Sequence, residues 1–191
     1  MRRKNEVAHY PEITNFIEAH LNSNFRSKGI EGVSIYWKNG ELTSKIKELI
    51  SENTEKCACL QSYCRKTPPL NLDIFGVITD GKKFEIIVLE IKLRENVGLA
   101  EWSQLVGYCL VSGAKYGLLV NIDNGGSPRL MQMLQTERHI SHIHTLVKEE
   151  SREHLLGFMQ WNSLTHNFEY SNLGIVRSLS ELSGQIADGF K

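Results

Sequence analysis

The sequence has no long apolar run, no excess of either charge and few cysteines. Its 191 residues include no stretch near the roughly 18 consecutive apolar residues that a membrane-spanning helix requires, so we expect no membrane association. Lysine and arginine together number 22, as do aspartate and glutamate, and the pI is about 7.1. This balance excludes a protein that attracts polyanions by its overall field. Any contact with a polyanion would depend on a local basic patch or on a more basic partner.

Four cysteines do not amount to the disulfide framework of a small secreted protein. Residues 1–4 are basic but lead into charged and polar residues, so they do not resemble a secretory signal. We therefore expect a soluble, cytoplasmic protein. The sequence also lacks repeats, low-complexity segments and linkers, and its length suits one hydrophobic core. Residues 1–191 are accordingly predicted to form a single domain.

The strongest local signal lies in residues 71–92, where two apolar runs flank an Asp-Gly turn. Asp-Gly between β-branched runs is typical of a β-hairpin. Three charges interrupt the apolar pattern: Asp73 in the first run, and Glu90 and Lys92 at the end of the second. Side chains alternate along a strand, so Glu90 and Lys92 point the same way and Asp73 can lie across from them. The sequence thus predicts two carboxylates and one ammonium at one end of a hairpin.

The rest of the chain predicts alternating helices and strands. Helices are predicted over residues 10–21, over 41–64 with an interruption near 51–54, and over 99–112. Residues 129–139 are expected to form a short helix or an ordered turn. Strands are expected over residues 29–38, followed by an Asn39-Gly40 turn, and over 116–123, 140–147, 154–161 and 167–170. The strand–helix–strand order after the hairpin implies a right-handed crossover to a parallel neighbour. The last three strands are polar enough to lie at a sheet edge or in an added hairpin. The predicted fold class is α/β, with a central mixed β-sheet flanked by helices.

The three charges of the hairpin suit a divalent cation. Mg²⁺ prefers oxygen ligands, commonly one or two carboxylates together with water and substrate phosphate. Asp73 and Glu90 would supply such ligands with the backbone carbonyl of Ile91, and Lys92 could orient a water molecule or stabilise charge on phosphorus. The alternative is a cross-strand salt bridge on a solvated sheet face. The apolar residues 84–89 disfavour it, because charges at the end of a buried strand are costly unless paired or metal-bound.

Two helices add polar residues to this set. Glu12 lies in the first turn of its helix, where the helix dipole favours an anion, and a plain surface position is the alternative. Gln104 and Tyr108 are four residues apart in a later helix and share a face. The order of helix glutamate, strand aspartate, Glu-Ile-Lys on the next strand and Gln-x-x-x-Tyr on the crossover helix resembles the PD-(D/E)XK nuclease superfamily. That superfamily includes restriction endonucleases, RecB-type nucleases and archaeal Holliday-junction resolvases.

The resemblance covers roughly residues 70–123 and implies a restriction-endonuclease-like core. It implies that Asp73 and Glu90 bind Mg²⁺, for which Mn²⁺ can substitute, and that Lys92 serves the attacking water. Leu72 stands where the name-giving motif has proline.

The same resemblance assigns roles to the helix residues. Glu12 would be a further active-site carboxylate from the N-terminal helix. Gln104 would be a hydrogen-bonding group of the active site, with Tyr108 beneath it.

The function expected from these residues is that of a Mg²⁺-dependent DNA endonuclease, of restriction type. The short, neutral chain leaves little room for an elaborate recognition domain, so a DNA-recognising partner subunit or a homodimer is expected. One alternative is a repair or junction-resolving nuclease, although such enzymes usually bind DNA as basic dimers. Another is a non-catalytic DNA-binding module with a nuclease-like fold, which the complete set of expected charged residues disfavours.

The cysteines form a second candidate site. Cys57, Cys59 and Cys64, with Cys109 as a fourth ligand, could bind zinc or an iron–sulfur cluster. Their spacing matches no familiar ligand pattern, and Cys109 falls in a helix expected to be buried. Reduced, partly buried cysteines are therefore the favoured interpretation.

Three histidines form a third candidate site. On a strand, His142 and His144 would share a face and could bind a metal, with His139 preceding them. No carboxylate or cysteine partner stands out nearby in the sequence. Histidines without a ligand role are therefore favoured.

Two basic pairs complete the candidates. Arg65-Lys66 before the first hairpin strand and Lys82-Lys83 at its turn could flank a phosphate-lined cleft. The alternative for each residue taken singly is an ordinary solvated surface position.

Overall fold

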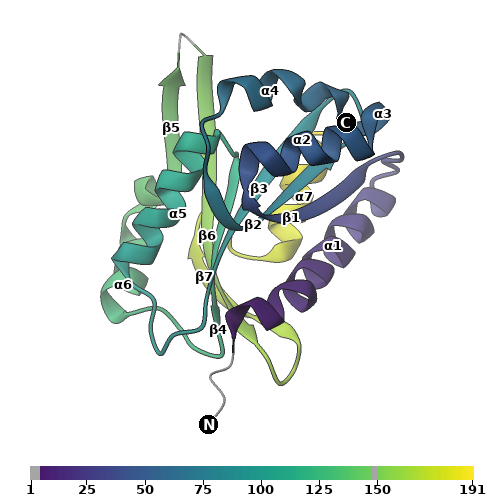
Figure 1. Ribbon diagram of the computed structural model, residues 1–191. Helices are drawn as coiled ribbons and strands as arrows, with labels where there is room; N and C mark the ends of the chain where they lie inside the picture. Colours follow the sequence, from purple (N-terminus) through teal and green to yellow (C-terminus); the bar gives the residue numbers. More distant parts are fainter. Residues whose placement is uncertain (1–4, 148–149) are drawn as a thin grey trace.

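The computed structural model describes residues 5–147 and 150–191. Within these ranges seven strands form one mixed sheet with helices on both faces (Figure 1). The strand order is β1-β2-β3-β4-β6-β5, and β7 also pairs with β6. The basic residues 1–4 lie outside the described ranges.

The elements have the following bounds. The strands are β1 (Ser34–Glu41), β2 (Asn71–Thr79), β3 (Phe84–Lys92), β4 (Tyr116–Ile122), β5 (His142–Val147), β6 (Glu150–Asn162) and β7 (Asn167–Gly174). The longer helices are α1 (Tyr10–Ser27), α2 (Leu42–Glu52), α5 (Leu99–Ser112), α6 (Pro128–Thr136) and α7 (Leu179–Asp188). The short helices are η1 (Glu6–His9), α3 (Thr54–Cys57), η2 (Ala58–Leu60), α4 (Gln61–Lys66) and η3 (Arg138–Ile140). None of the helices in the described ranges has the length and apolar character needed to cross a membrane.

The sheet combines antiparallel and parallel pairing. β1, β2 and β3 are antiparallel neighbours, whereas β4 runs parallel to both β3 and β6. β5 pairs antiparallel with the first part of β6, and β7 pairs antiparallel with its last part. α5 therefore makes the crossover between parallel strands that the sequence predicts.

Two hydrophobic cores lie on opposite faces of the sheet. Ile87 and Leu89 of β3 pack with α1 and α7 on one face. Ile86 and Val88, which alternate with them, pack with α2 and α5 on the other. Figure 1 shows α1 on one side of the strands and α5 on the other. Because both faces are covered, residues 86–89 of β3 form a continuous apolar run.

Several local predictions are confirmed. The hairpin forms between β2 and β3, and α5 spans the residues expected of it. The helical stretch after residue 41 is interrupted at Asn53, as predicted. α1 continues past residue 21 to Ser27, and α7 has no counterpart among the expected elements.

The predicted turn at Asn39-Gly40 is wrong. Pairing of β1 with β2 continues through Gly40 and Glu41, with an irregularity in register after Lys38. Gly40 has a φ of 99°, a conformation that favours glycine, and this lets the strand absorb the irregularity without turning back.

Of the two placements expected for residues 154–161, the sheet edge is wrong and the added hairpin is confirmed, because β6 pairs antiparallel with its sequence neighbours β5 and β7. β6 lies inside the sheet, with β4 on one side and β5 and β7 on the other. His154, which makes the segment look polar, is buried with both ring nitrogens bonded: Nδ1 lies 2.8 Å from the Ala114 carbonyl and Nε2 lies 3.1 Å from the Thr145 hydroxyl. A buried polar residue is tolerated in an interior strand when its hydrogen bonds are satisfied.

Candidate metal centre

Asp73, Glu90 and Lys92 lie together where β2 begins and β3 ends. The Lys92 ammonium is 3.0 Å from Asp73 Oδ2 and 2.5 Å from Glu90 Oε1. The backbone N–H of Ile91 also donates to Asp73 Oδ2, at 3.3 Å. One ammonium is therefore held between two carboxylates, one from each strand of the hairpin.

The register of the hairpin explains this convergence. β2 and β3 pair Ile74 with Leu89, so Asp73 and Glu90 occupy the next positions outward. Glu90 and Lys92 are two residues apart and share the face of β3 that α2 and α5 cover. The convergence follows from strand pairing alone.

Burial differs sharply among the three side chains. The Glu90 side chain is completely buried, whereas Asp73 is 26% exposed and Lys92 13% exposed. Despite the close ion pair with Lys92, neither oxygen of Glu90 accepts a well-oriented hydrogen bond from a described residue. Burial raises the pKa of Glu90 to about 7; Lys92 opposes this rise and the negative charge of Asp73 adds to it. Glu90 is thus a carboxylate whose charge the surrounding residues compensate only in part.

These residues fit a divalent cation. A buried carboxylate without hydrogen bonds is unfavourable, and a cation against its oxygens would remove that cost. Asp73 accepts both of its described hydrogen bonds, from the Ile91 N–H and the Lys92 ammonium, through Oδ2. Carboxylate oxygens are the donors that Mg²⁺ prefers. The carbonyl of Ile91 stays a predicted third ligand.

A third carboxylate, not predicted as a site residue, lies near Lys92. Glu101, in the first turn of α5, accepts a hydrogen bond of 2.8 Å from the backbone N–H of Gly98. This bond is the main reason that its pKa is lowered, and the charges of Arg94 and Lys92 contribute. Its place in the first helical turn is a sequence signal for capping, not for a site near Lys92.

The beginning of the N-terminal helix also lies near the carboxylates. The pKa of Tyr10 is raised, mainly by burial and further by the negative charges of Asp73, Glu6 and Glu90. Tyr10 therefore lies within electrostatic range of Asp73 and Glu90. No feature of the sequence around Tyr10 marks it as a site residue.

Glu12 lies elsewhere on α1. Its carboxylate is 43% exposed, 3.6 Å from His9 Nδ1 and 3.3 Å from His166 Nδ1. No hydrogen bond or ion pair among the described residues joins Glu12 to Asp73 or Glu90. Tyr10 of α1, by contrast, lies within electrostatic range of Asp73 and Glu90. The active-site role of Glu12 stays a prediction.

Gln104 and Tyr108 bond to each other on α5. The Gln104 side-chain amide donates to the Tyr108 hydroxyl at 2.7 Å, and Gln104 is exposed. In the described part of the chain, neither side chain bonds to Asp73, Glu90 or Lys92. The pair forms as its spacing predicts, whereas a role in the active site stays a prediction.

Asn121 of β4 fixes the loops beside the centre. It is buried and pairs in register with Lys92 across the parallel strands. Its side-chain amide donates to the carbonyls of Arg94 and Gly125, both at 3.0 Å, and its oxygen accepts from the Arg94 N–H at 3.2 Å. The loops after β3 and β4 are thereby joined at the end of the sheet where Glu90 and Lys92 lie.

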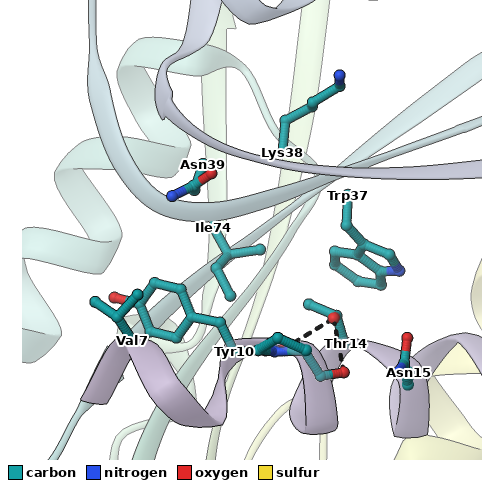
Figure 2. Close-up of a pocket in the computed structure, with 9 residues that line it drawn as sticks. Val7, Tyr10, Thr14, Asn15, Trp37, Lys38, Asn39 and Ile74 are labelled. Carbon is teal, nitrogen blue, oxygen red and sulfur yellow. Dashed lines mark hydrogen bonds between the residues drawn. The ribbon is translucent and has the colours of Figure 1, made fainter. Parts of the chain in front are cut away.

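A hollow of about 380 Å³ lies between α1 and the β1–β2 pair (Figure 2). Tyr10, Trp37 and Ile74 line it, and Figure 2 shows the Lys38 ammonium directed away from it. Lys38 instead pairs with Glu48 at 2.8 Å. The hollow is therefore mainly apolar and offers no inward cation for a phosphate group.

The cysteines have separate surroundings. Cys57 and Cys109 are buried in the hydrophobic core. Cys59 Sγ lies 3.5 Å from the Thr79 hydroxyl and Cys64 Sγ lies 3.4 Å from the Thr43 carbonyl. The one group of described residues with metal-ligand spacing contains no cysteine. These contacts favour reduced structural cysteines.

The basic pairs do not border the carboxylates as one cleft. Lys82 and Lys83 lie at the turn of the β2–β3 hairpin, and Glu90 lies at the opposite end of β3, roughly 25 Å away for a strand of this length. Lys83 is instead close to the carbonyls of Gly189 and Lys191. Arg65 and Lys66 are exposed at the end of α4.

Comparisons of the chain with protein-family models, with curated proteins and with solved structures found no match. The fold and the site define an α/β protein that carries two carboxylates and an ammonium at one end of a mixed sheet. What this centre does must be argued from its geometry.

Proposed function

We propose that the protein is a Mg²⁺-dependent endonuclease that hydrolyses phosphodiester bonds in DNA. The observation that carries the proposal is the buried Glu90 carboxylate, which lies beside Asp73 and Lys92 and accepts no well-oriented hydrogen bond from a described residue. A structural salt bridge would pair both oxygens, since buried charges without hydrogen bonds are costly. A buried carboxylate met, among the described residues, only by the Lys92 ammonium, on Oε1, is instead what a cation site would leave when the cation is removed.

Asp73 and Glu90 would hold the cation, together with the backbone carbonyl of Ile91. A divalent cation in such a site supplies positive charge to the scissile phosphate and makes water easier to deprotonate. Asp73 is partly exposed, so the cation and a phosphate group can reach the centre from solvent. The buried Glu90 holds its side of the site rigid, because strand pairing and packing fix its position.

Lys92 would position the attacking water and stabilise the charge that develops on the phosphate. Burial tends to lower the pKa of Lys92, but the carboxylates of Glu90 and Asp73 outweigh it and raise the pKa above its ordinary value. Lys92 thus carries its positive charge at neutral pH. A charged ammonium donates hydrogen bonds but cannot accept a proton, so Lys92 acts by position and charge and not as a base.

Within this class we favour a restriction-type enzyme with a restriction-endonuclease-like core. The β2–β3 hairpin, the α5 crossover and the parallel β4 have the order expected for such a core. The net charge of zero supports a cleavage subunit that relies on a DNA-recognising partner or on a second copy. A repair or junction-resolving nuclease would be expected to carry a stronger basic surface.

Incubation with supercoiled and linear DNA tests the proposal. We expect nicking or cutting in Mg²⁺ or Mn²⁺ that stops when a chelator is added. Asp73→Asn should abolish it while circular dichroism remains unchanged. Asp188→Asn is the matched control, because Asp188 lies on α7 and pairs with Lys28 and Lys191 away from the centre. Full activity of Asp73→Asn would refute the site, and metal-independent cutting would refute the mechanism.

A further inference from the structure

A second group of possible metal ligands lies on β5 and β6. Nitrogen atoms of His142 and His144 and a carboxylate oxygen of Glu153 all lie within 4.8 Å of one another. His142 and His144 are two residues apart on β5, so they share a face, and Glu153 pairs directly with His144 across the strands. The expectation that these histidines have no carboxylate partner is therefore wrong. The strand pairing supplies one.

The distances are close to those of a coordination sphere. His142 Nε2 lies 2.7 Å from Glu153 Oε1, and the two imidazole rings lie 4.4 Å apart between centroids. Tetrahedral Zn²⁺ with bonds of about 2.0 Å places neighbouring ligand atoms about 3.3 Å apart. The ligand atoms would need to move by a few tenths of an ångström to about 1.5 Å relative to one another to reach this spacing. Side-chain rotation can supply such movements while β-pairing holds the backbone in place.

We propose that His142, His144 and Glu153 form a second metal site that binds one transition-metal ion of the Zn²⁺ type. Two imidazoles with one carboxylate favour Zn²⁺ and similar ions over Mg²⁺, which prefers oxygen ligands. The His142 side chain is 33% exposed and that of Glu153 is 38% exposed, so an ion can enter from solvent. Three protein ligands leave a fourth position for water or another ligand.

A simple ion-pair cluster is the competing interpretation. Lys115 Nζ lies 3.5 Å from Glu153 Oε2 and would partly compensate the carboxylate without a metal. His144, however, makes no hydrogen bond to a described residue, and its described contact is the His142 ring. An ion pair between His142 and Glu153 does not require the imidazole of His144 at this position, whereas a metal site uses it as a third ligand.

This site does not depend on the proposed nuclease activity. Leu155, two residues after Glu153, pairs with Tyr116 at the start of β4, whereas Glu90 pairs with Leu119, three residues further along that strand. The two groups also differ in chemistry, since one is rich in oxygen donors and the other contains two imidazoles. They can therefore be tested separately on the intact chain.

Calorimetric titration of chelator-treated protein with Zn²⁺, in excess Mg²⁺, tests the proposal. We expect one Zn²⁺ per chain, with affinity about 10-fold lower or worse in His144→Ala and in Glu153→Gln. Co²⁺ should give visible absorption bands that the same variants lose. His139→Ala is the matched control, because His139 is exposed on the same segment and should leave Zn²⁺ binding unchanged.

Two results would overturn the proposal. One is the absence of Zn²⁺ binding by the intact protein. The other is unchanged binding by both His144→Ala and Glu153→Gln, which would place the ion at the cysteines or at Asp73 and Glu90. Since His144 is exposed, its alanine variant is expected to fold, and circular dichroism checks this.

Discussion

The ammonium of Lys92 lies 2.5 Å from Glu90 Oε1, two residues back along β3. The carboxylate that it faces is fully buried and accepts no well-oriented hydrogen bond from a described residue. Lys92 therefore stabilises a charge that the fold has desolvated, and Asp73 shares the same ammonium at 3.0 Å. Changes to any one of the three should alter both the stability of the fold and its response to metal.

Replacing Lys92 with alanine should abolish the proposed activity. We expect nicking of supercoiled DNA to fall about 100-fold or more, because the positioned charge near the phosphate is lost. The variant should also lose on the order of 3 kcal/mol of stability, since a buried carboxylate is left uncompensated. Lys92→Met keeps the apolar volume and should fail in nicking too. Lys82→Ala, at the exposed hairpin turn, is the control for both measurements, and nicking by Lys92→Met at the unmodified rate would contradict the role.

Replacing Glu90 with glutamine should stabilise the metal-free protein. The pKa of Glu90 is raised to about 7 in the folded state, above its ordinary value of 4.5. Between pH 4.5 and about 7 the folded state therefore binds more protons than the unfolded state. The contribution of Glu90 to the free energy of unfolding falls as pH rises through this range. Glutamine has no such ionisation, so above pH 7 its Tm should exceed that of the unmodified protein by a few degrees.

The same variant tests metal binding. Mg²⁺ should raise the Tm of the unmodified protein and leave that of Glu90→Gln unchanged. Glu52→Gln serves as the control, because Glu52 is an exposed glutamate that pairs with Lys38 and should leave both responses intact. An equal Mg²⁺ response in Glu90→Gln would remove Glu90 from the site.

Glu41 should contribute stability that is lost in acid. Its carboxylate accepts hydrogen bonds from the backbone N–H groups of Thr43 (2.9 Å) and Ser44 (2.7 Å) at the start of α2. Hydrogen bonds from these two residues lower its pKa to about 2. The contribution is therefore present above about pH 4.5 and lost as pH falls towards 2. At pH 7, Glu41→Ala should cost about 1 kcal/mol in urea denaturation, and exposed Glu31→Ala should cost nearly nothing.

The difference in the free energy of unfolding between Glu41→Ala and Glu31→Ala should narrow as pH is lowered. A constant difference from pH 7 to pH 2.5 would show that the ionised carboxylate of Glu41 is not the capping group. Both variants leave the candidate metal centre untouched, so their Mg²⁺ response is a further control.

Gly157 should not tolerate a side chain. A Cβ atom there would lie 2.5 Å from the Val176 carbonyl oxygen and 2.9 Å from its Cβ. Gly157→Ala is therefore expected to cost about 1–3 kcal/mol in thermal or urea unfolding, because the chain after β7 must shift. Gly107→Ala is the matched control: its Cβ would meet nothing within 4 Å in α5, so it should stabilise by roughly 0.5–1 kcal/mol. Equal stability of the two variants would contradict this packing.

The hairpin, α5 and β4 could be predicted because each depends on local pattern. An Asp-Gly turn and period-two alternation define β2 and β3, and helical periodicity defines α5. The pattern of residues 154–161 leaves a sheet edge and an added hairpin both open, because periodicity does not reveal which strand lies next to which. His154 looks like an edge residue until Ala114 and Thr145 are seen to satisfy its ring.

The sequence by itself determined that Asp73, Glu90 and Lys92 meet, since pairing within a short hairpin is set by its turn and alternation. Only the tertiary structure decided that Glu90 is buried and that Tyr10 lies near it, because these facts depend on how α1 and the other helices pack. The tertiary structure also decided that Glu153 lies beside His142 and His144. The residues between β5 and β6 carry no glycine, proline, asparagine or aspartate, so no turn signal fixes the register that brings them together.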